Sequence, residues 1–435
     1  MPSGSTAAKQ PQPSPAASTG GGKMPGTAKK PLLPPWYSLL APTKDGNPRA
    51  NLSNCVIVLR EAPELDGAIG FDVLRHETFV LKPLPWDEHL QGSRPWLEVD
   101  DSCLAIWLQE HDFAASSKLA AEAVETFAQR QRPFHPVLEY LDRVKWDGEP
   151  RLDTWTIDFL GCEDTPYTRE VSAKWPISAC ARIADPGTKA DCVLVLEGPQ
   201  GSGKSTALRT LGAPWFTDEI AALGTKDANE QLNGVWIVEL AELSAVRRAA
   251  DIATLNAFIT RSTDRYRPSY GRRVREYPRQ CVFAASTNDD QWNRDDTGGR
   301  RWWPLATTTI DVDGLRAVRD QLWAEAWTRY QSGETWWLQG DDIITQAKVE
   351  QEGRLTLDPW ENPISRWVDE NPHRDGLTTT EVLRDILSIP LADHDIAKQS
   401  RVGRIFVQRL KWHRRQQRVS GERVRRYYRT EEGKA

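Results

Sequence analysis

Apolar positions change their spacing repeatedly through the middle of the chain. From about residue 190 to 310, short apolar runs bounded by glycine or polar residues alternate with stretches in which apolar side chains recur every three or four positions. Strands that alternate with helices predict a parallel sheet flanked by helices. The amphipathic stretch 320–333 predicts a helix that closes this region. We therefore expect an α/β domain with a parallel sheet over residues 151–340.

The pattern differs before this central region. Residues 1–49, rich in proline, glycine and serine, predict a disordered tail. Two strand-like runs and three helical periods then predict an N-terminal α+β and helical region over residues 50–150. The strands are expected at 54–62 and 77–85, and the helices at 102–111, 117–131 and 135–148.

The pattern changes again after residue 358. Three short helical runs precede two short strands around a serine–glycine turn. This order predicts a winged-helix-like domain over residues 358–435, with its recognition helix near Gln399–Trp412. From Lys398 to Ala435 there are thirteen Lys and Arg against three Glu, the strongest basic bias in the chain. We expect this domain to bind duplex DNA.

Length, net charge, cysteine spacing and hydropathy limit the class of protein to which the chain can belong. The chain has 435 residues and a formal net charge of −5, so nucleic-acid binding requires a local basic surface. The six cysteines lack the spacing of zinc ligands, which indicates free thiols in a reducing compartment. No apolar run approaches the roughly 18 residues that cross a bilayer. We expect a cytoplasmic protein of a bacterial cell or phage-infected host, without membrane contact.

The segment 192–211 carries the most specific motif. An apolar run leads into GPQGSGKS at 198–205, which fits GxxxxGK[ST], and good helix formers follow. In this motif the backbone N–H groups and the helix N-terminus hold phosphates, the lysine reaches the β- and γ-phosphates, and the hydroxyl binds Mg²⁺. The sequence thus predicts ATP and Mg²⁺ as cofactors, bound by Gly198, Gly201, Ser202, Gly203, Lys204, Ser205 and Thr206.

Two later apolar runs are followed by polar side chains. Glu239 follows the run Val235–Val238, and Glu242 comes three residues later. A carboxylate at the end of a strand beside a phosphate loop holds Mg²⁺ or orients the attacking water. Glu239 is the preferred candidate for the Mg²⁺ ligand. Glu242 is expected either to activate the attacking water or to form an ion pair with a basic side chain on the surface. The run at 279–289 ends near Asn288, whose amide is expected to position the water or sense the γ-phosphate.

The segment TGGRRWWP at 297–304 follows the asparagine strand by about a dozen residues. In ring ATPases an arginine from the neighbouring subunit neutralises charge on the γ-phosphate. We expect Arg300 or Arg301 to be this arginine finger. Gly298 and Gly299 would let the loop project, and Trp302 and Trp303 would anchor it by packing.

A basic stretch lies between the acidic and asparagine strands. Residues 260–280 hold seven arginines with interleaved tyrosines, a composition suited to phosphate neutralisation and base stacking. We expect a hairpin centred on Gly271 that points into a ring channel and binds single-stranded DNA. A solvated loop paired with acidic neighbours is the alternative. The expected contacts are Arg265, Arg267, Arg272 and Arg273.

Together these motifs resemble the virulence-associated protein E family of phages and mobile elements. The resemblance covers roughly residues 100–340 and rests on WDGEPRLDTW, ADCVLVLEGPQGSGKST, WIVELAEL, TDRYRPSYGR, CVFAASTN, DDTGGRRWWP and QLWAEAW. The family is similar to superfamily 3 helicases of the AAA+ class, hexameric ATPases at replication origins. The resemblance implies the same roles for Lys204, Ser205, Glu239, Asn288 and Arg300 or Arg301. One departure is Leu240, which stands where many such helicases have a second acidic residue.

Three functions are compatible with these residues. The first is an ATP-driven replicative DNA helicase, or a helicase loader, of a phage or mobile element, assembled as a homo-oligomer and most simply a hexamer. The second is an ATP-switched DNA-binding or regulatory protein without unwinding activity. The third is a small-molecule phosphotransferase, which would be a monomer and would not respond to DNA.

Overall fold

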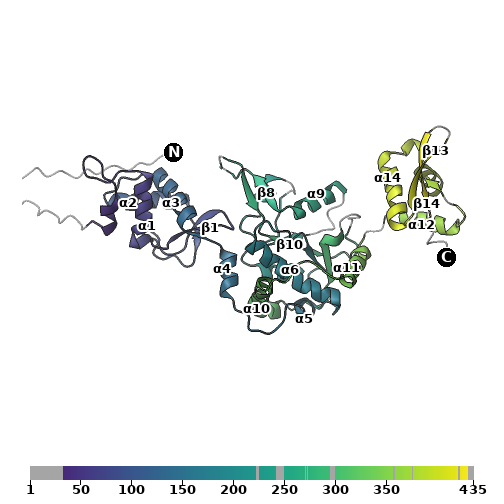
Figure 1. Cartoon of the computed structure of the whole chain (residues 1–435), viewed down its shortest axis with the longest axis horizontal. Coiled ribbons are helices and arrows are strands. Elements are labelled where there is room, and N and C mark those ends of the chain that lie inside the picture. Colours follow the sequence, from purple (N-terminus) through teal and green to yellow (C-terminus); the bar gives the residue numbers. More distant parts are fainter. Residues whose placement is uncertain are drawn as a thin grey trace, which may run out of the picture. The chain divides into compact units, whose positions relative to one another are not determined.

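The computed structural model describes residues 33–221, 225–241, 249–269, 271, 273–293, 299–355, 358–374, 376–419 and 422–429 (Figure 1). The chain divides into two compact units. One comprises residues 1–68, 82–92 and 97–127, and the other comprises residues 69–81, 93–96 and 128–435.

Helices dominate the first unit. They are α1 (Leu52–Glu61), α2 (Glu98–Glu110) and α3 (Ser117–Gln131), the last running past residue 127. A 3₁₀ helix at Pro35–Leu39 buries Trp36, whose ring contacts Trp107. Residues 1–32 of the expected disordered tail lie outside the described part of the chain. The predicted tail boundary at residue 49 is wrong, because Trp36 is part of this unit's core.

The predicted strand at 54–62 is also wrong, because this segment belongs to helix α1. The side chain of Asn51 accepts a hydrogen bond from the Asn54 backbone N–H and caps the helix. Burial then follows a helical repeat, with Cys55, Val58 and Leu59 inside. The run of β-branched residues suggested a strand, but the cap and the buried face determine a helix.

A small sheet and three helices precede the central sheet. The strands β1 (Ile69–Asp72), β2 (Glu77–Val80), β3 (Arg94–Pro95) and β4 (Pro133–Phe134) form a sheet in the order β3-β2-β1-β4. Strand β2 lies within the predicted segment 77–85. The helices are α4 (Pro136–Arg143), α5 (Trp155–Leu160) and α6 (Pro166–Ala184). Helix α4 ends before the expected Asp147-Gly148 stop.

The predicted parallel sheet is present and gives a mixed α/β fold. Its five strands lie in the order β11-β5-β10-β7-β6, and every neighbouring pair is parallel. The strands are β5 (Val193–Glu197), β6 (Phe216–Thr217), β7 (Ile237–Ala241), β10 (Val282–Thr287) and β11 (Trp302–Ala306). The helices of this region are α7 (Lys204–Gly212), α8 (Lys226–Glu230), α9 (Ala249–Thr260), α10 (Val312–Gln331) and α11 (Asp341–Gly353).

Both faces of the central sheet are covered. Leu194 and Leu196 of β5 join a core that includes residues of α6, α7 and α10. Val193 and Val195 point the opposite way, into a core that includes residues of α9. Strands that are buried on both faces consist of unbroken apolar runs. These runs allowed the strands of the central sheet to be predicted from the sequence.

An antiparallel hairpin is inserted before β10. Its strands are β8 (Thr263–Tyr266) and β9 (Arg275–Pro278), with Arg265 opposite Glu276. The expected hairpin around Gly271 is therefore present in the described residues. It leads directly into the strand that ends before Asn288.

Residues 358–429 contain the predicted three helices and hairpin. Helix α12 (Glu361–Glu370) is followed by β12 (Leu377–Thr378) and by α13 (Thr379–Glu381), which continues as a π-helical turn at Val382–Ile386. Helix α14 (Ile396–Arg404) likewise continues as a π-helical turn at Ile405–Arg409, and β13 (His413–Val419) pairs with β14 (Glu422–Tyr428). The sheet order is β12-β14-β13.

Among the described residues, no helix combines the length and apolarity that a bilayer crossing requires.

Candidate functional site

The predicted phosphate-site residues converge at the carboxyl edge of the central sheet. The loop 198–203 leaves β5, and Asn288 follows β10, which lies between β5 and β7. A cleft of about 810 Å³ opens here. In open α/β sheets, ligands bind outside the carboxyl ends of the strands. The cleft is lined by Gln200, Gly201, Ser202, Gly203, Lys204, Ser205, Thr206, Ala241, Ser286, Thr287, Asn288, Asp289 and Asp290.

Two glycines allow the backbone conformation of the loop. Gly203, with φ of 98°, precedes helix α7 in a left-handed conformation that favours glycine. Gly198 has φ of 156°, and a Cβ there would lie 2.7 Å from Thr307 Oγ1 and 3.0 Å from Thr307 O. The loop therefore packs closely on Thr307 at Gly198, where a side chain would meet backbone. At Gly203 a side chain would have space but would strain the left-handed backbone.

Lys204 folds back over the loop and reaches the asparagine strand. Its Nζ donates to the carbonyl oxygens of Gly198 at 2.8 Å and Pro199 at 2.7 Å, and to Asn288 Oδ1 at 3.0 Å. Burial lowers the pKa of Lys204, and the nearby Glu239 carboxylate opposes this effect. The ammonium group thus joins two of the predicted site elements directly.

Glu239, the third predicted site element, bonds to the loop helix α7 and to β10 through two serines. The hydroxyls of Ser205 and Ser286 each donate to Glu239 Oε1 at 2.6 Å, and the two hydroxyl oxygens lie 3.3 Å apart. The side chain of Glu239 is 1% exposed, and its Oε2 has no hydrogen-bond partner among the described residues. A buried carboxylate oxygen without a partner carries an unfavourable desolvation free energy unless a ligand compensates it.

These oxygens fit a magnesium ion. Mg²⁺ is usually held in proteins by one or two carboxylates, with water and substrate phosphates supplying the other oxygens. The Ser205 hydroxyl, the Glu239 carboxylate and the adjacent cleft match that donor set. The predicted ligands Ser205 and Glu239 therefore lie where both could bind one ion.

One detail of the prediction is wrong. Glu239 was expected at the end of its strand, but it is the third residue of β7, with Leu240 and Ala241 after it. The strand continues because Leu240 pairs with Ala285 of β10 and is buried. The alternative carboxylate, Glu242, lies outside the described residues.

Arg300 and Arg301 are not brought to the loop. They form a short 3₁₀ turn directly before β11, where Trp302 pairs with Val193 at the amino edge of the sheet. The loop lies at the opposite edge, beyond the length of β5 or roughly 15–20 Å away. Arg301 Nε is instead 3.8 Å from Asp191 Oδ2. Trp302 and Trp303 are buried in the cores on the two faces of the sheet, so the tryptophans anchor this turn as expected.

A part-buried ion pair that the sequence did not reveal lies at the start of the loop. Glu197, the residue before Gly198, accepts hydrogen bonds from Arg354 Nη2 at 2.9 Å and Trp292 Nε1 at 2.7 Å. Burial alone would lower the pKa of Arg354, but its hydrogen bonds to Glu197 and Glu350 raise it overall. The only sequence signal was a glutamate at the end of a wholly apolar strand. Its partner, 157 positions away, has no local pattern.

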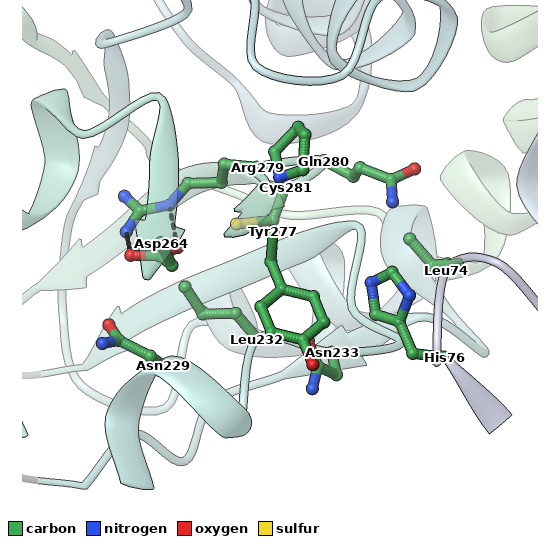
Figure 2. A pocket seen from close by; sticks show the side chains of 11 residues that line it. Leu74, His76, Asn229, Leu232, Asn233, Asp264, Tyr277, Arg279, Gln280 and Cys281 are labelled. Carbon is green, nitrogen blue, oxygen red and sulfur yellow. Dashed lines mark hydrogen bonds and ion pairs between the residues drawn. The ribbon is translucent and has the colours of Figure 1, made fainter. Parts of the chain in front are cut away.

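The base of the β8–β9 hairpin is held by buried contacts. Arg279 Nη2 contacts Asp264 Oδ1 at 2.8 Å, and both side chains are almost fully buried. Tyr266 stacks on Tyr277 with ring centroids 4.6 Å apart. Figure 2 shows His76, from the turn between β1 and β2, next to Tyr277 in the lining of a water-sized pocket. The two ring centroids lie 4.7 Å apart, and burial, followed by the charge of Arg275, lowers the pKa of His76.

The outer part of the hairpin carries the predicted DNA contacts. The side chains of Arg265, Arg267 and Arg273 are exposed, and the closest carboxylate to Arg265 is Glu276, 4.0 Å away. The fourth predicted contact, Arg272, lies outside the described residues. Two arginines of the same stretch, Arg261 and Arg279, contact Asp264 and hold the base instead. The exposed arginines are compatible both with DNA contact and with the alternative of a solvated loop that pairs with acidic neighbours.

Comparison with known proteins gives a family model and several similar solved structures. Residues 141–355 match the family model described as the virulence-associated protein E-like domain. An apo structure of the NrS-1 C terminal region (305-718) is 12% identical, with a TM-score of 0.46, covering 84% of this chain and 97% of that one. An A form apo structure of the same region is 12% identical with a TM-score of 0.44, covering 83% and 96%. Comparison with curated proteins gave no match.

Proposed function

We propose that this chain, which belongs to the virulence-associated protein E-like family through its residues 141–355, is an ATP-hydrolysing replicative helicase or helicase-like protein of a phage or mobile genetic element. The observation that carries the proposal is that Lys204, Ser205 and Asn288 line one cleft and that Ser205 bonds to the buried Glu239 beside it. Lys204 and Ser205 begin helix α7, whereas Glu239 lies on β7 and Asn288 follows β10. Lys204 bonds to Asn288, 84 positions away, and the neighbouring Ser205 bonds to Glu239. The AAA+ or superfamily 3-like class of P-loop ATPase accounts for all four.

Each residue has a defined task in this proposal. The N–H groups of the loop and of the first turn of α7 bind the phosphates, and Lys204 exchanges its contacts with Gly198 and Pro199 for β- and γ-phosphate oxygens. Ser205 and Glu239 hold Mg²⁺, which would supply charge neutralisation on the phosphates. Asn288 positions the attacking water or senses the γ-phosphate.

We propose that the arginine finger acts between the subunits of an oligomer. Arg300 and Arg301 lie at the amino edge of the sheet, while the loop is at the carboxyl edge. Neither arginine can reach the ATP of its own subunit without unfolding β11. We therefore assign one of them to the ATP of a neighbouring subunit in a homo-oligomeric ring, most simply a hexamer.

A continuous segment links the ATP site to the proposed DNA contact. Strand β9 leads through Arg279 into β10, and β10 ends directly before Asn288. Because Arg279 is bound to Asp264 and its backbone N–H donates to Ser262 O, we expect the hairpin base to move with β10. A displacement of Asn288 during hydrolysis would therefore move Arg265, Arg267 and Arg273 along a single strand of DNA.

Strand displacement tests this function against its alternatives. The purified protein with ATP and Mg²⁺ is expected to separate a forked duplex. Hydrolysis without separation would assign the chain to the ATP-switched DNA-binding or regulatory proteins. Turnover that needs a small-molecule acceptor, ignores DNA and occurs in a monomer would assign it to the phosphotransferases.

A further inference from the structure

The basic side chains of the C-terminal region, residues 358–429, differ in whether they are paired. Arg401 donates to both carboxylate oxygens of Asp358 at 2.7 Å, and its guanidinium lies 4.0 Å above the Trp360 ring. Arg409 contacts Glu361 at 3.0 Å. On the expected recognition helix, these two arginines therefore hold the region together and are not available to a ligand.

The arginines of the β13–β14 hairpin differ from those of α14 in that most are exposed. Its strands and the residue after them contain seven arginines and one glutamate. Among the described residues, no carboxylate pairs with the exposed arginines of this hairpin. These exposed arginines are Arg414, Arg415, Arg418, Arg423 and Arg425.

Strand register places like charges opposite one another. Arg418 pairs with Arg423, and Arg415 pairs with Arg426, in the antiparallel ladder. Like charges directly opposite are destabilising, because their side chains are neighbours on one face. A polyanion that contacts both members of a pair removes this repulsion.

The inner end of the hairpin is nevertheless well fixed. The ring of Tyr427 stacks on Phe406 with centroids 5.3 Å apart, and Arg429 Nη2 donates to Val368 O at 2.6 Å. Arg426 Nη1 donates to Gly376 O at 2.6 Å. The outer end, beyond these contacts, is thus presented as a preformed basic ribbon, and little conformational entropy is lost when it binds.

We propose that the β13–β14 hairpin, and not helix α14, is the main duplex-DNA contact of the C-terminal region, binding phosphates without reading sequence. This inference rests on the proposed function, because it takes DNA as the substrate. A two-stranded ribbon fits the major groove of B-DNA. Because Arg418 and Arg423 lie on one face and Arg415 on the other, the ribbon reaches phosphates on both sides of the groove.

Single-stranded nucleic acid is a poorer fit for this surface. Binding of unpaired bases relies on aromatic side chains on which the bases stack. The outer residues 414–418 and 423–426 are arginine, glutamine and valine and include no aromatic residue. The buried Tyr427 is already stacked on Phe406.

The test measures binding of a labelled duplex to the full-length protein across a range of salt concentrations. The double variant R418A/R423A is expected to lose about tenfold in affinity, and the slope of log K against log salt is expected to fall by about two. The charge-retaining variant R418K/R423K is expected to keep most of the affinity. The matched control R366A/R384A removes two exposed arginines of α12 and the α13 segment, and is expected to bind as wild type does.

Several outcomes would overturn the inference. They are unchanged binding by R418A/R423A, an equal loss in R366A/R384A, a loss in R418K/R423K as large as in the alanine variant, or preferential binding of single strands through the same arginines. The ATPase rate of each variant separates this inference from the proposed function. Loss of duplex binding confined to the hairpin variants supports the hairpin assignment even if the wild type does not hydrolyse ATP.

Discussion

The part-buried Arg354 forms an ion pair with the buried Glu197, the last strand residue before the glycine-rich loop, with Nη2 and Oε2 2.9 Å apart. Arg354 directly follows helix α11, whose Gln351 donates from Nε2 to Trp302 O at 2.9 Å, next to the proposed finger Arg301. The end of α11 therefore contacts both the root of the loop and the turn that carries the finger. We infer that it holds these two parts of the ATPase domain in fixed relation.

The first prediction concerns this ion pair. Arg354→Ala leaves the Glu197 carboxylate buried with Trp292 as its remaining hydrogen-bond donor, and is expected to lower the free energy of unfolding by about 3 kcal/mol. Arg354→Lys, which keeps the charge but not the two-pronged geometry, is expected to lose less. Urea unfolding measures both. A change within about 0.5 kcal/mol for Arg354→Ala would mean that the pair does not support the loop.

The second prediction concerns the unpartnered Glu239 oxygen. Glu239→Gln keeps the shape of the side chain but removes its charge, and is expected to bind ATP while losing about 10²-fold or more in hydrolysis. Hydrolysis by the wild type is expected to stop when Mg²⁺ is chelated and to return when it is added back. Equal turnover by Glu239→Gln and wild type at saturating Mg²⁺ would remove Glu239 from the metal site.

Ser286→Ala is the companion variant, because Ser286 donates to Glu239 Oε1 from β10. Removing that hydroxyl leaves Ser205 as the other donor to this oxygen. We expect a higher Mg²⁺ requirement and a smaller loss of turnover than in Glu239→Gln. A loss as large as that of Glu239→Gln would indicate a direct role for Ser286.

The third prediction concerns the arginines at the amino edge of the sheet. Arg301→Ala or Arg300→Ala is expected to lower hydrolysis by about 10³-fold, whereas ATP binding persists. Mixing that variant with Lys204→Ala subunits is expected to restore part of the activity, because some interfaces then combine an intact Lys204 with an intact finger. ATPase assays of the mixtures decide which arginine acts. If no mixture regains activity with either arginine, the finger does not act between subunits.

The fourth prediction concerns the β8–β9 hairpin. The triple variant R265A/R267A/R273A is expected to retain its basal ATPase rate and to lose stimulation by single-stranded DNA. Each phosphate contact removed should lower the salt slope of binding by about 0.7. Arg316→Ala, which removes an exposed, ion-paired arginine of α10, is the control and should change neither quantity. Full stimulation of the triple variant would place the DNA contact elsewhere.

The sequence located those parts of the candidate site that have local patterns. The loop, Glu239 and Asn288 each stand in or beside an apolar strand, and parallel strands bring their carboxyl ends to one edge of the sheet. The same logic identified the β8–β9 hairpin from its tyrosines, arginines and central glycine. In these cases a short segment contains most of the information that determines its structure.

Contacts between distant segments could not be predicted in this way. The partners Glu197 and Arg354, or His76 and Tyr277, are unrelated by any local spacing. Helix α1 was predicted as a strand because its β-branched residues outweighed the Asn51 cap. The recognition helix was predicted from its basic residues, but Arg401 is neutralised by Asp358, which lies 43 positions away and could not be identified as its partner from the sequence.

The ATPase rate of the purified protein, measured with and without single-stranded DNA beside Lys204→Ala, tests the central claim most directly. The account predicts Mg²⁺-dependent hydrolysis that single-stranded DNA stimulates and that Lys204→Ala abolishes, because the Lys204 ammonium binds the β- and γ-phosphates. Equal turnover by wild type and Lys204→Ala, or no turnover by the wild type under any of these conditions, would contradict it.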